Sequence, residues 1–462
     1  MVSTRKLALE YIDSALDKDP TALAKEHQVI LQADKLKPED RGLFQELGAG
    51  VLREWGFLNW VCSQRTKQKP KRRVQQLLAL GAYQLIFLDR VPAYAIFAES
   101  QNLAKEYNVS DAEQKFVHGV LKSIEKEAGA LRVRRDQALE ALLSTEQLPQ
   151  DDLEWAVLNA PASLLDALTV VDSGLNKKAA RLRGVRALAT MKIAPPFLGY
   201  AMPGGSCRSK ATPYLSRVAP RALLLEAGAT LTEDLQSGAV RIQGEASQWA
   251  CEKAADQLEK LSAISSGRVL QVCELAAGKG GKLLGTLSAW TAKRGQNPGA
   301  VPRLVWQSFD RSEAQLEILK RDALPLVKRC WPQVEVICTR AEEEDLPQVD
   351  QGSYDLVWLD APCTGFGTLA KLPQISLRWG ESAYDHALEL GSLQKQLCAQ
   401  AKVLLKPMGR FFYTVCTLTR PETHEVVKRC ESLFERAPLF TEALWPGAKP
   451  APRSEGFFSA MF

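Results

Sequence analysis

The pattern of apolar and polar positions divides the chain into regions of different character. Over the first 126 residues, apolar side chains recur every three or four positions, as in LALEYIDSAL, FQELGAGVLREWGFLNWV, VQQLLALGAYQLIFL and FVHGVLKSI. This spacing is typical of amphipathic helices. It predicts an all-helical domain over residues 1–130.

From about residue 236 the pattern predicts strands that alternate with helices. A short strand and a helix in VRIQGEASQWACEKAADQL come first, followed by apolar strands at RVLQVCEL, RLVWQSFD, VEVICT, YDLVWLD and RFFYTVC. Alternation of this kind predicts βαβ units and a mostly parallel, twisted sheet. The last segment, EGFFSAMF, is expected to form an antiparallel edge strand. Residues 236–462 are therefore predicted to be a Rossmann-like α/β domain.

Residues 131–235 separate these two regions. They contain the Pro/Gly-rich passage APPFLGYAMPGGS, whose turn signals interrupt any long element. We expect a linker and a small α+β domain here. The predicted fold class is thus multidomain, α and α/β.

Size and composition fit a soluble protein of several domains. The chain has 462 residues, of which 46% are hydrophobic and 24% charged. It contains no apolar run near the roughly 18 residues that span a bilayer, and its N-terminus does not resemble a signal peptide, so we expect a cytoplasmic protein with no membrane partner. The sequence leaves the oligomeric state open, with a monomer as the working expectation.

The cysteine pattern argues against a metal site. Ten cysteines occur without any C-x-x-C pair, and the four histidines do not cluster with them. This usage predicts a reducing compartment and no bound metal.

Basic residues are concentrated in local segments, while the net charge is only +5. The segment RTKQKPKRR is the densest, and two further clusters follow at Arg132, Arg134 and Arg135 and at Lys177, Lys178, Arg181, Arg183 and Arg186. Each segment is compatible with a solvated helix surface or with a patch that contacts phosphates. The charge pattern alone does not decide between them.

A glycine-rich turn after the first strand is the candidate cofactor site. Three glycines in ELAAGKGGK allow the backbone to approach a ligand, although a turn without any ligand would look alike. The second strand ends in Asp310, a position suited to a ribose diol or to a helix cap. The segment is neither G-x-G-x-x-G nor a P-loop, so a nucleoside cofactor without a phosphate cradle, S-adenosylmethionine, is predicted. The expected cofactor-binding residues are Ala276, Ala277, Gly278, Lys279, Gly280, Gly281, Lys282, Asp310 and Asp360.

Two strand ends carry the candidate reaction centre. The strand YDLVWLD leads into Asp360 and, three residues later, Cys363, and the strand RFFYTVC ends in Cys416. Ligands of open α/β sheets bind at the carboxyl ends of strands. Either cysteine alone would be read as a core or turn residue, but together with the carboxylate they predict one catalytic crevice.

Motifs over most of the chain resemble those of a known family. DAPCTGFGTL resembles D-A-P-C-S-G-x-G, YTVCTLTRPETHEVV resembles Y-S-T-C-S/T-L with its following E-N-E helix, AAGKGGK resembles C-A-A-P-G-G-K, and RIQGEASQ resembles V-Q-D-x-S-S. These are motifs of the RNA cytosine-5 methyltransferases. The stretches VLREWGFLNWV, VQQLLALGAYQLIFLDRVPAYAI and QKFVHGVLKSI resemble the antitermination factor NusB. This domain is fused to the front of one 16S rRNA-type group of these enzymes, the RsmB/Sun group.

The resemblance implies a substrate, a cofactor and a set of catalytic residues. The substrate would be an unpaired cytosine of RNA, most plausibly 16S rRNA, methylated at carbon 5 by S-adenosylmethionine. Cys416 would add to carbon 6, Cys363 would assist release, a protonated Asp360 of raised pKa would face ring nitrogen 3, and Lys282 would contact the base or the cofactor. The helical domain would contact RNA or protein.

Several positions differ from the family pattern. Glu274 replaces Asp, Lys279 replaces Pro, Arg340 stands where an Asp usually meets adenine, and Gln374 replaces an acid. Two longer differences are Thr423-His424 for Asn-Glu and Leu198-Gly199-Tyr200-Ala201 for an L-R-x-N strand. Arg340 and the altered helix behind Cys416 motivate a second hypothesis, a catalytically silent RNA-binding assembly factor. A nucleotide-dependent oxidoreductase is a third, disfavoured because no dinucleotide fingerprint is present.

Overall fold

The computed structural model describes residues 3–462 except 20–21, 145, 170–174, 206, 217, 227, 266, 342–350 and 448–454. The chain forms two compact units that do not follow sequence order. The first unit combines Met1–Ala194 with Thr368–Tyr384, and the second combines Pro195–Gly367 with Asp385–Phe462.

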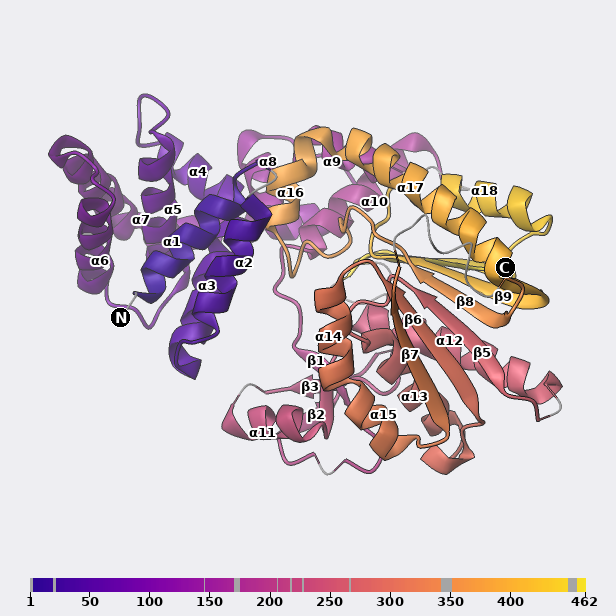
Figure 1. Ribbon diagram of the computed structural model, residues 1–462. Helices are drawn as coiled ribbons and strands as arrows, with labels where there is room; N and C mark the ends of the chain where they lie inside the picture. Colours follow the sequence, from indigo (N-terminus) through magenta and orange to yellow (C-terminus); the bar gives the residue numbers. More distant parts are fainter. Residues whose placement is uncertain are drawn as a thin grey trace. The chain divides into compact units, whose positions relative to one another are not determined.

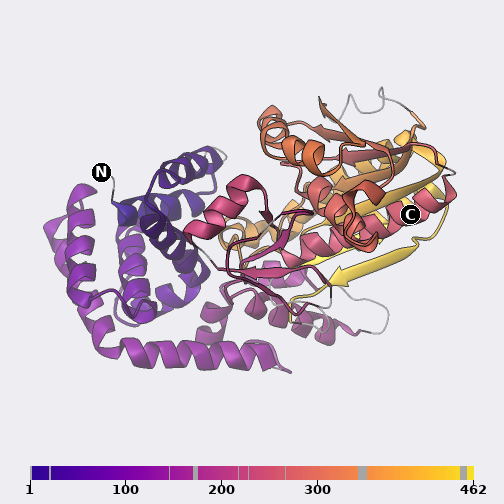
Figure 2. The same ribbon diagram turned by 90° about the horizontal axis from the view of Figure 1, so that it is seen from below.

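The first unit is helical, as the three- and four-residue spacing predicts (Figures 1 and 2). Its helices from the N-terminal part of the chain are α1 (Thr4–Ala15), α2 (Ala22–Ala33), α3 (Pro38–Arg53), α4 (Trp55–Ser63), α5 (Arg72–Phe87), α6 (Ala93–Glu106), α7 (Asp111–Ser144), α8 (Asp152–Leu158), α9 (Ala162–Ala167) and α10 (Lys177–Thr190). Helix α5 is buried over most of its length and packs on α7, where Gly81 leaves room for Leu121. Burial of an apolar face against neighbouring helices is how such helices are stabilised.

A short segment from the C-terminal half completes this helical unit. It contains α16 (Gln374–Trp379) and the 3₁₀ turn η3 (Gly380–Ser382). Gln374 donates to one carboxylate oxygen of the buried Glu26 at 3.0 Å, and Arg378 donates to the other at 2.7 Å. Gln374 is therefore part of a structural contact, which explains why an amide fits where the family pattern has an acid.

The second unit contains a seven-stranded sheet in the order β10-β11-β9-β8-β5-β6-β7. The strands are β5 (Leu270–Leu275), β6 (Leu304–Asp310), β7 (Val334–Arg340), β8 (Tyr354–Asp360), β9 (Leu405–Val415), β10 (Phe440–Leu444) and β11 (Phe457–Met461). Strands β5 to β9 pair in parallel, which confirms the predicted sheet. The terminal strand β11 is antiparallel as predicted. It is not an edge strand, however, because it pairs with both β9 and β10.

Helices cover both faces of this sheet. Figure 1 shows α12 and α13 on one side and α17 and α18 on the other. The bounds of the helical elements are α11 (Ala229–Ser237), α12 (Glu245–Ile264), α13 (Gly281–Lys293), η1 (Pro298–Ala300), α14 (Glu313–Asp322), α15 (Leu324–Cys330), α17 (Ala383–Leu404) and α18 (His424–Phe434).

A second, four-stranded antiparallel sheet precedes the large one and matches the predicted small α+β region. Its order is β2-β3-β1-β4, with β1 (Leu198–Ala201), β2 (Ala211–Pro213), β3 (Leu223–Leu225) and β4 (Val240–Ile242). The LGYA segment that departs from the family pattern forms β1, and Tyr200 in it is buried. This strand therefore contributes to the core of the unit.

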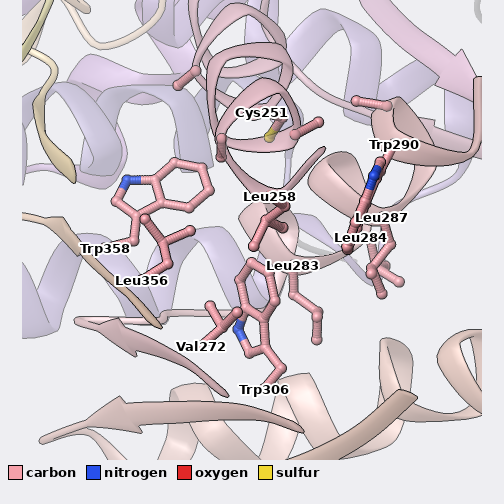
Figure 3. Packing of buried hydrophobic residues seen from close by; sticks show 14 of the residues in the cluster. Cys251, Leu258, Val272, Leu283, Leu284, Leu287, Trp290, Trp306, Leu356 and Trp358 are labelled. Atoms are coloured by element: carbon pink, nitrogen blue, oxygen red, sulfur yellow. The ribbon is translucent and has the colours of Figure 1, made fainter. Parts of the chain in front are cut away.

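The core of the second unit fixes the strand ends that carry the predicted chemistry. Figure 3 shows Trp306, Trp358 and Leu356 of the sheet packed near Leu258 and Leu283 of the covering helices. Both tryptophans are fully buried, and each indole N–H finds an acceptor: Trp306 donates to Glu274 and Trp358 donates to Thr414, both at 2.9 Å. Buried indoles usually need such a partner, so these contacts set the positions of the strands that carry them.

Candidate active site

A cavity of about 310 Å³ lies at the carboxyl edge of the parallel sheet. The residues that line it share a position at or just after a strand end, or face it from α17: Leu275, Ala276, Phe309, Asp310, Arg311, Ala341, Leu359, Asp360, Pro362 and Leu397. Pockets that hold small ligands begin near this volume and are mostly apolar with a few polar groups. Its location is the one that open α/β sheets use for ligands.

Asp310 fixes the conformation of the glycine-rich turn between β5 and α13 through a hydrogen bond. Gly278 has a φ of +56°, a left-handed conformation that favours glycine, and its N–H donates to Asp310 at 2.8 Å. The second carboxylate oxygen of Asp310 accepts from the N–H of Ser312, also at 2.8 Å. Ser312 itself caps α14, so Asp310 is not the cap. Each oxygen of Asp310 keeps a lone pair for the hydroxyls of a ribose.

Three of the predicted cofactor-binding residues line the cavity, namely Ala276, Asp310 and Asp360. The others, Ala277, Gly278, Lys279, Gly280, Gly281 and Lys282, form the turn and the first residues of α13 instead. Among these, the N–H of Ala277 donates to the carbonyl of Phe309 at 2.9 Å, which ties the turn to the neighbouring strand. A cavity between a glycine turn and a strand-end acid fits an adenosine-containing cofactor in size and chemistry.

Two arginines lie close to the same strand ends. Arg311 lines the cavity, and Arg340 is the last residue of β7, paired in register with Asp310. The Nε of Arg340 donates to the carbonyl of Arg311 at 3.3 Å. A guanidinium thus occupies the strand end where the family pattern has an acid.

The structure brings the two strand-end thiols together. The Sγ atoms of Cys363 and Cys416 lie 3.2 Å apart, although 53 positions separate them in the sequence. Each thiol is partly accessible. Their loops are joined by a hydrogen bond from the Gly367 N–H to the carbonyl of Cys416 at 2.9 Å. A Cβ at Gly367 would lie 1.9 Å from the carbonyl oxygen of Gly456, which precedes β11, so only glycine fits at this position.

Asp360 is paired with Lys282 beside the thiols. The ammonium of Lys282 lies 2.9 Å from one carboxylate oxygen, and the hydroxyl of Thr414 donates to the other at 2.7 Å. Burial by itself lowers the pKa of Lys282, but the Asp360 carboxylate outweighs it and raises that pKa above its ordinary value. Both contacts place a hydrogen-bond donor on an oxygen of Asp360.

Cys363 is held as a thiol in this arrangement. Its hydrogen bond to the Cys416 sulfur is the largest cause that raises its pKa well above the ordinary value, followed by burial and by the negative charges of Cys416 and Glu422. A thiol with a raised pKa keeps its proton and can donate it to the neighbouring sulfur. The two cysteines are thus chemically distinct.

Two groups that support the site were not singled out from the sequence. Thr414 orients Asp360, and Glu422 contacts the loop that carries Cys363. Thr414 lies two residues before Cys416 on the same strand and therefore on the same face, which is a signal that the sequence offers. Glu422 lies in the segment that resembles the E-N-E helix of the family, but no role was assigned to it from the sequence.

Within the part of the chain that the structure describes, no group of three His, Cys, Asp or Glu side chains is arranged to hold a metal. A search of the same residues finds no helix with both the length and the apolar character needed to cross a bilayer.

The basic segment RTKQKPKRR is partly neutralised by acidic neighbours. Arg65 pairs with Glu127, Lys71 with Glu113, and Arg72 and Arg73 with Asp13. Lys67 and Lys69 are exposed, and neither has a carboxylate partner among the described residues. The charge available to a phosphate in this segment is therefore smaller than the sequence suggests.

Two family models match separate parts of the chain. Residues 2–126 match the NusB family, and residues 310–444 match the family described as 16S rRNA methyltransferase RsmB/F. The order of the two matches is the order predicted from the sequence motifs.

Two relatives are similar to this chain over most of their length, and a third over a shorter part. The probable ribosomal RNA small subunit methyltransferase B of Bacillus subtilis is 25% identical over 419 residues, which cover 86% of this chain and 81% of that protein. The methyltransferase B of Shewanella oneidensis is 25% identical over 92% of this chain and 89% of its own. Ribosomal RNA small subunit methyltransferase F of Shewanella loihica is 38% identical over 107 residues, 23% of this chain and 21% of that protein.

Solved structures support the fold. The crystal structure of PH0851 aligns over 100% of this chain and 99% of its own with a TM-score of 0.62, at 16% sequence identity. Together with the family matches, this confirms the predicted combination of a NusB-like helical domain and an S-adenosylmethionine-dependent methyltransferase fold.

Proposed function

This chain joins a NusB-family domain to a methyltransferase domain of the RsmB/F family, and from that premise we propose that it methylates carbon 5 of a cytosine in small-subunit rRNA. S-adenosylmethionine supplies the methyl group in this proposal. The observation that carries it is the 3.2 Å separation of the Cys363 and Cys416 sulfurs, beside the Asp360–Lys282 pair and at the same sheet edge as the cofactor-sized cavity.

The reaction needs a nucleophile, because carbon 5 of cytosine is unreactive until a group adds at carbon 6. We assign this role to Cys416. Its sulfur forms a bond to carbon 6, and a proton must reach ring nitrogen 3 as charge develops there. The Lys282–Asp360 pair suits that task, since Lys282 carries a proton and Asp360 fixes its position at 2.9 Å.

Release reverses the addition once the methyl group has been transferred. The proton on carbon 5 leaves to a base, the electron pair reforms the ring double bond, and the Cys416 sulfur departs as the thiolate, the form in which it attacked. The proton on ring nitrogen 3 returns to the amine of Lys282. Cys363 is placed to assist at this stage because it keeps its own proton and lies against the departing sulfur. A cytosine must leave its stack to reach these groups, so loop or unpaired RNA is the preferred substrate.

RNA contact outside the crevice is assigned to the first 235 residues. We propose that residues 1–130 form an RNA- or protein-binding domain, that residues 131–235 form a linker and small RNA-binding subdomain, and that residues 236–462 carry the chemistry. The exposed Lys67 and Lys69 are candidate phosphate contacts. A cytoplasmic location and a monomeric state are part of this proposal.

The experiment uses the full-length protein with labelled S-adenosylmethionine and small-subunit rRNA. We expect label in 5-methylcytosine, none with Cys416→Ala, and a covalent protein–RNA adduct that accumulates with Cys363→Ala. Cys338→Ala, which removes a partly exposed thiol of β7, is the matched control and should behave as the unmodified protein. A Cys363→Ala protein that shows no retarded band on a denaturing gel would contradict the assigned roles.

The silent assembly factor is the competing proposal. It is motivated by Arg340 and by the altered helix start behind Cys416. The cavity of about 310 Å³ and the paired thiols favour the enzyme, because a scaffold needs neither. Salt-sensitive rRNA binding without methyl incorporation, over rRNA and tRNA pools, would decide for the scaffold.

A further inference from the structure

A single buried carboxylate joins the two loops that carry the thiols. Glu422 follows Cys416 on the loop before α18 and is fully buried. One of its oxygens accepts from the N–H of Thr364 at 2.8 Å, and the other accepts from the Thr364 hydroxyl at 2.7 Å. Thr364 is the residue after Cys363. The backbone next to one thiol is therefore bound through two atoms to a side chain from the loop of the other thiol.

Two more donors complete the environment of this carboxylate. The amide of Gln394 on α17 donates to it at 3.1 Å, and the hydroxyl of Thr419 donates at 2.6 Å. Together with the N–H and hydroxyl of Thr364, these donors fill the lone pairs that an ionised carboxylate presents. No cation contacts Glu422 among the described residues. Burial raises the pKa of Glu422 above its ordinary value, and these hydrogen bonds reduce that rise without cancelling it.

A second connection runs through the same amide. Gln394 also donates to the carbonyl of Pro362, the residue before Cys363, at 2.8 Å. Its own oxygen lies 2.8 Å from the hydroxyl of Tyr413 on β9, the strand that ends at Cys416. Residues on both sides of Cys363 are thus bound to groups anchored to the strand and loop of Cys416.

We propose that Glu422 is a positioning residue for the reaction, which fixes the Cys363 loop against the Cys416 loop and so holds the two sulfurs at their working separation. The proposal rests on the function assigned above. A buried charge is costly unless it is fully hydrogen-bonded, and a neutral residue would satisfy packing alone. Glu422 also adds negative charge near Cys363, in the direction that keeps that thiol protonated.

The first experiment measures the thiol pair without the reaction. Phenylarsine oxide condenses with two neighbouring thiols to give one dithioarsenite and one water, and a small competing dithiol reverses this. We expect Glu422→Ala to release the arsenical at an about 10-fold lower concentration of the competing dithiol. Without Glu422 the two loops are no longer tied together, and this lowers the effective concentration of one sulfur near the other. Glu422→Gln should bind as tightly as the unmodified protein. The amide oxygen can keep the bonds from the Thr364 N–H and from Gln394, while the hydroxyls of Thr364 and Thr419, which share the other oxygen, can turn to accept from the amide nitrogen.

Three controls make this measurement specific. Cys363→Ala must abolish capture, because Cys398 and Cys430 form another neighbouring pair that is buried. Glu425→Gln is the matched control, since Glu425 lies three residues later and pairs with Lys395 at 3.4 Å and with Arg420 at 3.8 Å, but not with the residues on either side of Cys363. If Glu422→Ala does not fold, Thr364→Val can be used instead, because it removes the hydrogen bond from the Thr364 hydroxyl to Glu422 with little change in shape. This variant should also release the arsenical at a lower concentration of the competing dithiol.

The second experiment separates this inference from the proposed function. In the methylation assay, Glu422→Ala should lower kcat about 100-fold, the usual cost of a small misplacement of reacting groups. Its KM for S-adenosylmethionine should stay within about 2-fold, because Glu422 does not line the cavity. Glu422→Gln should restore most of kcat.

The outcomes are distinguishable. An unmodified protein that never methylates cytosine overturns the proposed function, while the capture measurement still reports on the thiol pair. Capture by Glu422→Ala that equals the unmodified protein, or an equal fall with Glu422→Gln, overturns the positioning role whatever the methylation result.

Discussion

Glu274 makes the stability of the second unit depend on pH in a direction unusual for a carboxylate. Its side chain is fully buried in the central strand β5. One oxygen accepts from Trp306 at 2.9 Å and from Ser308 at 3.2 Å, and the other has no hydrogen-bond partner among the described residues. Burial raises the pKa of Glu274 to about 7, and the nearby charge of Asp360 adds to that rise.

The sign follows from proton binding. Because the folded-state pKa of about 7 exceeds the ordinary 4.5, the folded protein binds more protons than the unfolded chain between these values. The stabilisation is complete below about pH 4.5 and is lost as the pH rises through 7. Its full size is about 3 kcal/mol, from the difference between the two pKa values.

The substitution Glu274→Gln tests this, because the amide imitates the protonated acid at every pH. Hydrogen exchange of the β5 amides is compared between the two proteins at the same pH, so that intrinsic exchange rates cancel. We expect similar protection at pH 5 and about 100-fold greater protection of the variant at pH 8.

An oppositely signed control strengthens the test. Burial opposes ionisation of Asp355, but Arg268, the Gln271 amide and Lys406 outweigh it and lower the pKa of Asp355. Its stabilisation is present at neutral pH and is lost in acid, so Asp355→Asn should lose protection at pH 8. The test compares how strongly the β5 amides are protected from exchange in Glu274→Gln and in the unmodified protein. If the ratio of the two protection factors is the same at pH 5 and pH 8, the reasoning is refuted.

Three further predictions concern the site and its surface. Gly367→Ala places a Cβ 1.9 Å from a backbone oxygen and should lower the free energy of unfolding, measured by thermal unfolding, by about 1–3 kcal/mol. Gly281→Ala is the control and should be near neutral, because its Cβ would meet no heavy atom within 4 Å. Equal losses of stability in the two variants would contradict the close approach at Gly367. Lys282→Met should lower methyl transfer about 100-fold or more at saturating cofactor, and unchanged kcat would exclude its donor role. Lys67→Gln with Lys69→Gln should reduce the slope of log affinity for RNA against log salt by about 1–2, and an unchanged slope would place the contacts elsewhere.

The strands that lead into the site were predictable because each is a nearly continuous apolar run. A strand buried on both faces has this pattern, and β8 is buried along almost its whole length. Strand β10 was missed because its sequence FTEAL is neither a continuous apolar run nor a strict alternation of apolar and polar residues, and it is only partly buried. Its presence moves β11 to an interior position, since edge or interior depends on a partner that periodicity does not identify.

The groups of the site that lie at strand ends could be predicted from the sequence. The contacts between side chains of different elements could not. Cys363 and Cys416 could be placed at one sheet edge because parallel strands end together. The pairing of Asp360 with Lys282 could not be predicted, because it depends on an ammonium 2.9 Å away on a different element. Glu422 belongs to the segment that resembles the E-N-E helix, but its burial and its four donors are visible only in the structure.

The segment Thr368–Tyr384 has a consequence for how this chain can be divided. It leaves the reactive loop directly after Gly367, contributes to the helical unit, and returns at Asp385. An N-terminal fragment ending at residue 194 would therefore lack Gln374 and Arg378. Its buried Glu26 carboxylate would lose the hydrogen bonds that these two residues donate. The two units are therefore interleaved along the sequence. Neither unit can be removed or exchanged as one continuous segment without also removing or rebuilding part of the other.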